Sequence, residues 1–243
     1  AFVRNGARVY IASRKKKILD IAAAELNALG PGECYAIEAN LNSKEACEKL
    51  ATEIGAREKG KLDILVNNAG TVFDATLFDF PEKEWDNIYN LNVKSYIRCL
   101  PLLEKASHKP DDPSRVIIVG SISGEGDLRG IVEVKRITSI VYNSSKAAVH
   151  NIAKNLAVHF TPRGVNVNVI APGVIFTEMT SNKDISSCIS EVPQGRLGVE
   201  SDIAGSALFL ASHAGSWVSG IIMPVDGGTL LRNKDLGMKM AKL

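Results

Sequence analysis

Short apolar runs alternate with longer segments of helical period along the chain. Runs rich in Val, Ile and Tyr are typical of buried strands, and they occur at residues 8–12, 34–37, 62–66, 116–119, 165–170 and 221–223. Between them, apolar residues spaced three and four apart predict helices over residues 15–29, 43–57, 82–105, 139–160 and 201–211. Strands that alternate with helices predict an α/β fold, a doubly wound parallel sheet with helices on both faces.

The ends of the predicted elements add further detail. Two helices follow polar residues that are typical of a helix start, Asn42 and Asp79. Residues 1–6 resemble the last turn of a helix that ends at Gly6. Because a doubly wound sheet starts with a strand and a glycine-rich turn, we expect about one strand and turn, on the order of 20 to 30 residues, to be missing before Ala1.

The composition is that of an ordinary globular protein. Of 243 residues, 45% are hydrophobic and 23% are charged, and no linker divides the chain, so we expect a single domain over residues 1–243. The net charge of +2 comes from interspersed charges, which argues against nucleic-acid binding. The cysteines and histidines show no metal-ligand spacing, so we predict reduced thiols and no metal. No run approaches the roughly 18 apolar residues of a membrane helix, which predicts a soluble intracellular protein.

One pair of residues has a spacing suited to proton transfer. Tyr142 and Lys146 lie four residues apart on a predicted helix, which places the phenol and the ammonium on one face. A nearby ammonium stabilises phenolate and lowers the tyrosine pKa, as a general acid working near neutral pH requires. The pair alone is weak evidence, because a lysine beside a half-buried tyrosine is common on helices.

Four polar clusters strengthen this interpretation, because each follows a predicted strand or lies on a neighbouring helix. Parallel sheets bind ligands at the carboxyl ends of their strands. The clusters are Asn67-Asn68-Ala69-Gly70, Asn92 in the helix over 82–105, Gly120-Ser121-Ile122-Ser123-Gly124, and Pro172-Gly173-Val174-Ile175-Phe176-Thr177. With these pieces in this order, the sequence resembles the short-chain dehydrogenase/reductase family, in particular its 3-oxoacyl-carrier-protein reductase-like members. The resemblance runs from Ala1 to about Thr229 and includes the C-terminal signature Val225-Asp226-Gly227-Gly228.

The resemblance implies a Rossmann-like fold and an NADPH-dependent reduction of a carbonyl, a 3-oxoacyl thioester or a similar ketone, to an alcohol. Tyr142 would protonate the substrate oxygen, and Lys146 would lower the Tyr142 pKa and bind the nicotinamide ribose. Ser121 would hold the carbonyl oxygen near Tyr142, with Ser123 as the alternative for this role. Asn92 would anchor the water chain that returns the proton to Tyr142.

The resemblance also implies a set of cofactor-binding residues. They are Asn67, Ala69 and Gly70 on the adenosine and ribose side, Asn40 and Leu41 near the adenine ring, and Pro172, Gly173, Ile175 and Thr177 towards the nicotinamide, besides Tyr142 and Lys146. Asn40 stands where the family commonly has an aspartate. An amide can still bind adenine, so this departure is mild.

Residues at the end of the first predicted strand indicate which dinucleotide binds. In dinucleotide folds, a carboxylate at this place accepts a hydrogen bond from the ribose 2′-hydroxyl and repels a 2′-phosphate, whereas Ser and Arg bind the phosphate. Here Ser13 and Arg14 end the strand, three lysines follow, and no acid occurs before Asp20. Cations at a helix N-terminus oppose the macrodipole unless an anion binds nearby. We therefore predict NADP(H) over NAD.

Three other segments also carry predictions. Ser121 and Tyr142 are 21 residues apart, a longer separation than the family usually shows, so residues 127–140 look like an insertion. Residues 178–196, which mix Met179, Ile185, Cys188, Ile189 and Val192 with polar residues, are expected to form a substrate lid. In the tail over 230–243, the final Ala241-Lys242-Leu243 resembles a peroxisomal address; otherwise we expect a cytoplasmic protein.

Assembly and two alternative functions complete the expectations. The helices over 82–105 and 139–160 carry more apolar positions than one sheet face needs, and the resembling family builds dimers from them, so we predict a homotetramer or dimer. A non-catalytic or inactive dinucleotide-fold subunit is one alternative to the reductase, because the glycine-rich turn is missing from the sequence. An NAD-linked alcohol dehydrogenase is the other.

Overall fold

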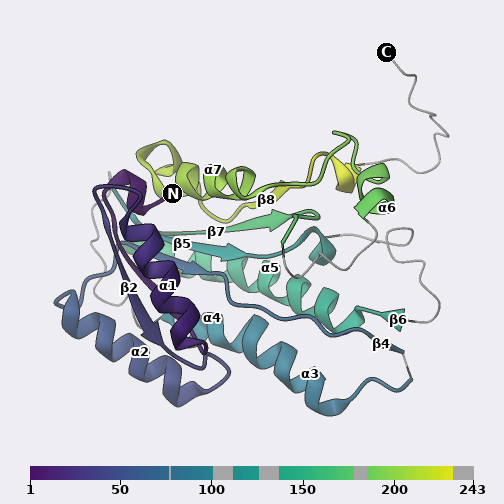
Figure 1. Cartoon of the computed structure of the whole chain (residues 1–243), viewed down its shortest axis with the longest axis horizontal. Coiled ribbons are helices and arrows are strands. Elements are labelled where there is room, and N and C mark those ends of the chain that lie inside the picture. Colours follow the sequence, from purple (N-terminus) through teal and green to yellow (C-terminus); the bar gives the residue numbers. More distant parts are fainter. Residues whose placement is uncertain (77, 101–111, 126–136, 178–184, 232–243) are drawn as a thin grey trace.

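The computed structural model describes residues 1–76, 78–100, 112–125, 137–177 and 185–231 (Figure 1). The predicted address Ala241-Lys242-Leu243, Met179 in the predicted lid and most of the predicted insertion lie outside the described residues, so those expectations stay predictions.

Each of the six predicted strands is present in the structure. They are β1 (Arg8–Ser13), β2 (Glu33–Glu38), β3 (Ile64–Asn67), β5 (Ser114–Val119), β7 (Val165–Pro172) and β8 (Ile222–Val225). Each adjacent pair among them is parallel. The helices are α1 (Lys16–Asn27), α2 (Lys44–Arg57), α3 (Glu82–Tyr89), α4 (Ser95–Arg98), α5 (Ile140–Phe160), α6 (Ile185–Ser190) and α7 (Glu200–Ala211). This order confirms the predicted α/β fold with a parallel sheet.

The strands form two parallel sheets, whereas the sequence pattern predicts one. One sheet pairs β1 with β2, and the other has the order β3-β5-β7-β8. In the described part of the chain no hydrogen-bonded pairing joins β1 to β3.

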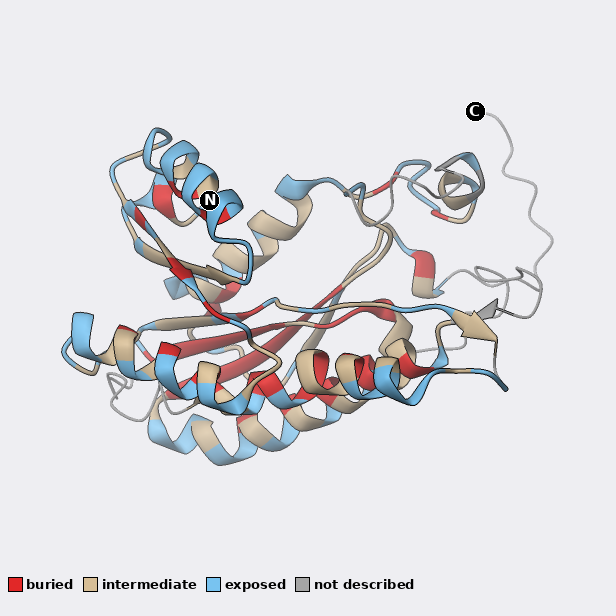
Figure 2. Cartoon of the chain, turned by 60° about the horizontal axis from the view of Figure 1, so that its bottom comes forward, coloured by how far each residue is buried: buried red, intermediate tan, exposed pale blue. Residues whose placement is uncertain are grey.

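Helices cover both faces of the four-stranded sheet. Alternate residues of a strand point to opposite faces, so they contact different helices. Val116 and Ile118 of β5 pack in one core cluster with Val149 of α5, whereas Ile117 packs in another with Leu210 of α7. Figure 2 shows the buried residues concentrated in the strands of this sheet and on the helix faces turned towards them. The sheet is therefore packed between helices, and its carboxyl edge carries the polar clusters.

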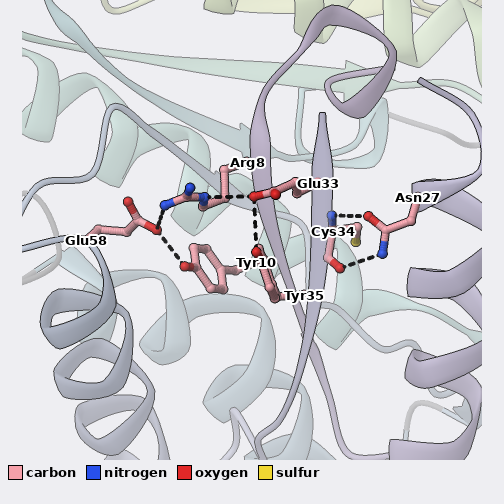
Figure 3. A network of polar contacts seen from close by, with 7 residues as sticks. All are labelled: Arg8, Tyr10, Asn27, Glu33, Cys34, Tyr35 and Glu58. Atoms are coloured by element: carbon pink, nitrogen blue, oxygen red, sulfur yellow. Dashed lines mark hydrogen bonds and ion pairs between the residues drawn. The ribbon is translucent and has the colours of Figure 1, made fainter. Parts of the chain in front are cut away.

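The smaller sheet is held by polar contacts at its amino end, away from the predicted cofactor edge (Figure 3). Arg8 on β1 forms ion pairs with Glu33 on β2 and with Glu58 after α2, at 3.1 and 3.3 Å. Tyr10 donates a hydrogen bond to Glu58 over 2.5 Å and stacks on Tyr35. Burial of Tyr10 and this bond raise the pKa of the phenol to about 12. The contacts fix β1 and β2 to each other and to α2.

Three local features differ from the sequence expectations. The helix over 82–105 is interrupted by a π-helical turn, Asn90–Lys94, between α3 and α4. Ser43, one residue after the predicted Asn42, caps α2, because its hydroxyl accepts the Ala46 N–H. Asp79 does not cap α3; it accepts a hydrogen bond from Thr76 instead.

A pair of two-residue strands was not predicted from the sequence. The strand β4 (Ala75–Thr76) pairs antiparallel with β6 (Ile137–Thr138). Ser139 also donates a hydrogen bond to Asp74 beside this pair. The end of the predicted insertion is therefore attached to the segment that follows β3.

The N-terminal turn ends at the predicted glycine, and three of the four cysteines are buried. Residues Val3–Asn5 form a 3₁₀ turn that ends at Gly6, whose φ of 83° lies in the left-handed region favoured by glycine. Cys34, Cys47 and Cys99 are buried free thiols, and Cys188 is half-buried. In the part of the chain that the structure describes, no helix is long and apolar enough to span a membrane.

Candidate active site

The structure brings Tyr142, Ser121 and Lys146 together at the carboxyl end of β5. Ser121 follows that strand after one glycine, and Tyr142 and Lys146 lie on one face of α5. Ser121 lies close enough to the Tyr142 phenol to lower the phenol pKa through side-chain hydrogen bonding. The Lys146 Nζ lies 5.6 Å from the centre of the Tyr142 ring. Ser121 and Lys146 are buried. The Ser123 backbone N–H donates to the Ser121 hydroxyl over 3.1 Å.

Burial shifts both titratable groups of this cluster towards their neutral forms. It raises the pKa of Tyr142, and the hydrogen bond from Ser121 lowers that pKa by a smaller amount. It lowers the pKa of the Lys146 ammonium to about 8. The expected net lowering of the Tyr142 pKa is therefore not seen here, because burial dominates and the Lys146 Nζ donates its 2.8 Å hydrogen bond to the Val119 carbonyl.

Asn92 lies in the π-helical turn and is fully buried. Its Oδ1 accepts the Thr71 N–H over 2.8 Å, and its Nδ2 donates to the Thr71 carbonyl and to the Ser145 hydroxyl, each over 3.0 Å. π-Helical turns inside α-helices occur frequently at functional sites. Asn92 therefore links the segment after β3 to Ser145 of α5, which is the residue before Lys146.

The segment after β3 passes close to these side chains. A Cβ on Gly70 would lie 3.4 Å from the Asn92 Oδ1 and 3.7 Å from the Lys146 Nζ. The Ala69 carbonyl accepts a 2.8 Å hydrogen bond from Tyr96, and Asn67 is buried with its Nδ2 3.4 Å from the Tyr96 carbonyl oxygen. Tyr96 was not found from the sequence, where it reads as one more apolar position of a helix.

Ser13 and Arg14 lie at the carboxyl end of the smaller sheet, apart from the tyrosine. The Ser13 hydroxyl accepts the Lys15 N–H over 3.3 Å. Arg14 is exposed and has no hydrogen-bond or ion-pair partner among the described residues. The helix α1 that follows has neither a side-chain cap nor an acid in its first turn. This end of the helix thus offers free N–H donors beside cations, which suits an anionic group.

The two residues predicted near the adenine follow β2. Asn40 is exposed, and its Oδ1 accepts the Asn42 N–H over 3.3 Å. Leu41 is half-buried against the core under α2. Both lie at the same sheet edge as Ser13, because β1 and β2 are parallel and in register.

The segment Pro172–Thr177 leaves the end of β7 beside the C-terminal signature. A Cβ on Gly173 would lie 2.8 Å from the Asp226 Cα, so only glycine lets the two turns approach. The Asp226 carboxylate accepts the N–H groups of Gly228 and Leu230, over 2.9 and 2.7 Å. A cavity of about 350 Å³ lies next to these turns, and its lining includes Ile175, Val192 and Asp226.

The described part of the predicted lid contributes to this cavity. Val192 is buried, and Cys188 and Ile189 are half-buried. Arg196 forms a two-point ion pair with Asp202 at the start of α7. The cavity does not include Tyr142. The described residues thus form two neighbouring features at one sheet edge, the tyrosine cluster and this cavity.

The fold carries a tyrosine and a lysine on one helix face at the carboxyl edge of the sheet. This combination defines the class of protein as a Rossmann-type oxidoreductase. No three His, Cys, Asp or Glu side chains within the described ranges gather into a cluster that could hold a metal ion.

Comparison with known proteins gives the family. The family model described as enoyl-(acyl carrier protein) reductase matches residues 1–229. The rhamnolipids biosynthesis 3-oxoacyl-[acyl-carrier-protein] reductase of Pseudomonas aeruginosa is 35% identical over 232 residues, which cover 92% of this chain and 86% of the relative. The 3-oxoacyl-[acyl-carrier-protein] reductase FabG of Escherichia coli is 32% identical, over 90% of this chain and 88% of the relative.

Solved structures agree with these relatives. The Pseudomonas aeruginosa RhlG/NADP active-site complex superposes with a TM-score of 0.83 at 35% identity, and the match covers 94% of this chain and 88% of that chain. The chain belongs to the short-chain dehydrogenase/reductase family, as the sequence motifs indicate. It is an oxidoreductase of this family.

Proposed function

We propose that this protein reduces the carbonyl of a 3-oxoacyl thioester or a similar ketone to an alcohol with NADPH. The observation that carries the proposal is the grouping of Ser121, Tyr142 and Lys146 at the carboxyl end of β5, with the Lys146 Nζ 5.6 Å from the centre of the Tyr142 ring. The named relatives act on 3-oxoacyl carrier-protein substrates, and a similar structure holds NADP. Both facts support the proposal. Steady-state NADPH oxidation in the presence of a short 3-oxoacyl thioester tests it.

The residues present fit a dinucleotide that spans the sheet edge. Arg14 and the uncapped start of α1 suit the 2′-phosphate end. Gly70 leaves the space beside Lys146 and Asn92 free of a side chain. Asn67, Ala69, Asn40 and Leu41 would lie along the adenosine side, and Pro172, Gly173, Ile175 and Thr177 would lie towards the nicotinamide.

The chemistry divides between the cofactor and three side chains. The cofactor, when bound, supplies the hydride. Ser121 donates a hydrogen bond to the carbonyl oxygen and holds it beside Tyr142. Tyr142 then gives its phenolic proton to the oxygen as negative charge develops there. The Lys146 ammonium stabilises the phenolate that remains, and Asn92 anchors the water chain that returns a proton to Tyr142 through Lys146.

Arg14 and Ser13 are expected to decide between the two dinucleotides. Arg14→Ala removes a charge-assisted contact worth about 1.5 to 3 kcal/mol, so NADPH affinity should fall roughly ten- to a hundredfold. NADH affinity should hardly change. Ser13→Asp should invert the preference, because the carboxylate repels the 2′-phosphate and accepts from the ribose hydroxyls.

The measurement is kcat/KM for both cofactors in the wild type and the two variants. Lys17→Ala, which removes a charge from the same helix start, is the matched control and should change the ratio much less. Equal losses with NADH and NADPH would show that Arg14 and Ser13 serve folding. A wild type that prefers NADH would favour an NAD-linked alcohol dehydrogenase.

We also propose a homotetramer or dimer. The helices α3 and α5 expose apolar side chains, including Trp85, Ile140 and Val158, which a second copy would cover. Light scattering of the full-length protein at micromolar concentration should give a mass at least twice that of one chain. A monomer under these conditions would contradict the proposal.

A further inference from the structure

A buried histidine lies beneath the turn that carries Ser121. His150 is on α5, one helical turn after Lys146, and only 3% of it is exposed. Its Nδ1 lies 2.6 Å from the Glu125 Oε1, and its Nε2 lies 3.5 Å from the Ser121 backbone nitrogen. The steps proposed for the reaction do not use this side chain, yet each ring nitrogen faces a polar group at the end of the same short turn.

The turn is shaped around the imidazole ring. A Cβ on Gly120 would lie 2.3 Å from the His150 Nε2, and a Cβ on Gly124 would lie 2.9 Å from its Cε1. Both positions therefore need glycine for the backbone to lie against the ring. Because the Ser121 hydroxyl accepts the Ser123 N–H within this turn, the place of that hydroxyl depends on where the turn rests on the histidine.

The two contacts select one protonation state of the ring. A backbone N–H only donates, so the His150 Nε2 must be the acceptor for Ser121. The ring proton then lies on Nδ1 and is donated to the Glu125 carboxylate. A doubly protonated ring would set an N–H against the Ser121 N–H and break this contact. Glu125 thus orients the ring, and the neutral ring holds the turn.

The charged groups around His150 shift its pKa in both directions. Burial lowers its pKa most, and the hydrogen bond and negative charge of Glu125 raise it. The positive charges of Lys146 and Lys154, on the same helix, lower it. The neutral state that the contacts require is thus favoured by burial and opposed by one carboxylate.

We propose that His150, oriented by Glu125, is a positioning residue that holds the Ser121 turn in register with Tyr142. The proposal rests on the proposed function, because its kinetic part needs a reaction in which Ser121 acts. It assigns His150 no contact with substrate or cofactor. It concerns how Ser121 is aligned and predicts a loss in kcat without a loss in cofactor binding.

Three variants test the kinetic part. His150→Leu keeps a similar volume but removes both nitrogens, and it should lower kcat roughly ten- to a hundredfold through misalignment of Ser121, with an unchanged Kd for NADPH. His150→Gln can place an amide oxygen where Nε2 lies and should restore most of kcat. His159→Leu, the same change at an exposed position of α5, should have no effect. Equal losses in the Leu and Gln variants, or none in either, would overturn the proposal.

The pH profile supplies a readout that a purely structural role would not move. Protonation of His150 breaks the contact with Ser121, so kcat of the wild type should fall as the pH drops through the His150 pKa. Glu125→Gln removes the charge that raises this pKa, so the fall should move to lower pH. In His150→Gln this fall should be absent. An acid limb that is identical in all three proteins would contradict the proposal.

A measurement without substrate separates this proposal from the proposed function. Nitrogen-15 spectra of the His150 ring near neutral pH should show a protonated Nδ1 and an unprotonated Nε2. If the protein reduces no carbonyl and the spectra show this state, the proposed function fails but the contact with Ser121 stands. A protonated Nε2 would refute the contact whatever the activity.

Discussion

Tyr142→Phe is expected to reduce kcat by about 10²- to 10⁴-fold, the contribution of a positioned general acid. The variant keeps the ring that packs beside Lys146 and loses only the hydroxyl, whose pKa Ser121 lowers. Its affinity for NADPH should therefore be that of the wild type. The measurement is the steady-state rate with a 3-oxoacyl thioester, together with NADPH binding by fluorescence.

The control for Tyr142→Phe is the same substitution far from the site. Tyr35→Phe removes a hydroxyl that bonds Glu33 on the smaller sheet and should leave kcat unchanged. If Tyr142→Phe retains the wild-type rate, Tyr142 is not the proton donor, and the catalytic assignment fails.

Lys146→Met is expected to lower kcat/KM by roughly 10²- to 10³-fold, the loss found when one preorganised charge-stabilising donor is removed. The variant keeps the length of the side chain but has no charge near the Tyr142 phenolate. Because Lys146 would also bind the nicotinamide ribose, the KM for NADPH should rise, which distinguishes this variant from Tyr142→Phe. Lys154→Met, on an exposed part of the same helix, is the matched control. Equal effects of the two lysine variants would contradict the assignment.

The pKa of Lys146 adds a dependence on pH. Burial lowers this pKa to about 8, so the ammonium is present below that pH and is lost as the pH rises through it. Tyr142 must also be protonated to act as an acid. Both groups therefore predict that the rate of carbonyl reduction falls on the alkaline side, and the two losses overlap.

The sequence predicted the strands and the main helices well, because their hydrophobic spacing is regular. The end of a predicted strand gave Ser121 as a candidate, since ligand sites in parallel sheets lie where the strands end. Helical spacing to Lys146 gave Tyr142, and the family resemblance gave the role of Asn92. The structure brings Ser121 and Tyr142 together and places Asn92 beside the residue before Lys146.

Other features depend on contacts between distant segments, which spacing does not reveal. His150 looks like an ordinary helix residue until its ring is seen against Gly120 and Gly124. The π-helical turn at Asn92 has no signal in the hydrophobic pattern. The net rise in the Tyr142 pKa comes from burial, which outweighs its bond with Ser121. Pairing of β4 with β6 depends on residues that are far apart in the chain.

The most direct test of the account is to follow the hydride itself. NADPH carrying deuterium at nicotinamide C4, on one face or the other, is incubated with the protein and a short 3-oxoacyl thioester, and the product is analysed by mass spectrometry. The account predicts a hydroxyacyl product with deuterium on the former carbonyl carbon from one of the two labelled cofactors only, and almost none with Tyr142→Phe. A wild-type protein that binds NADPH but forms no labelled alcohol would contradict it.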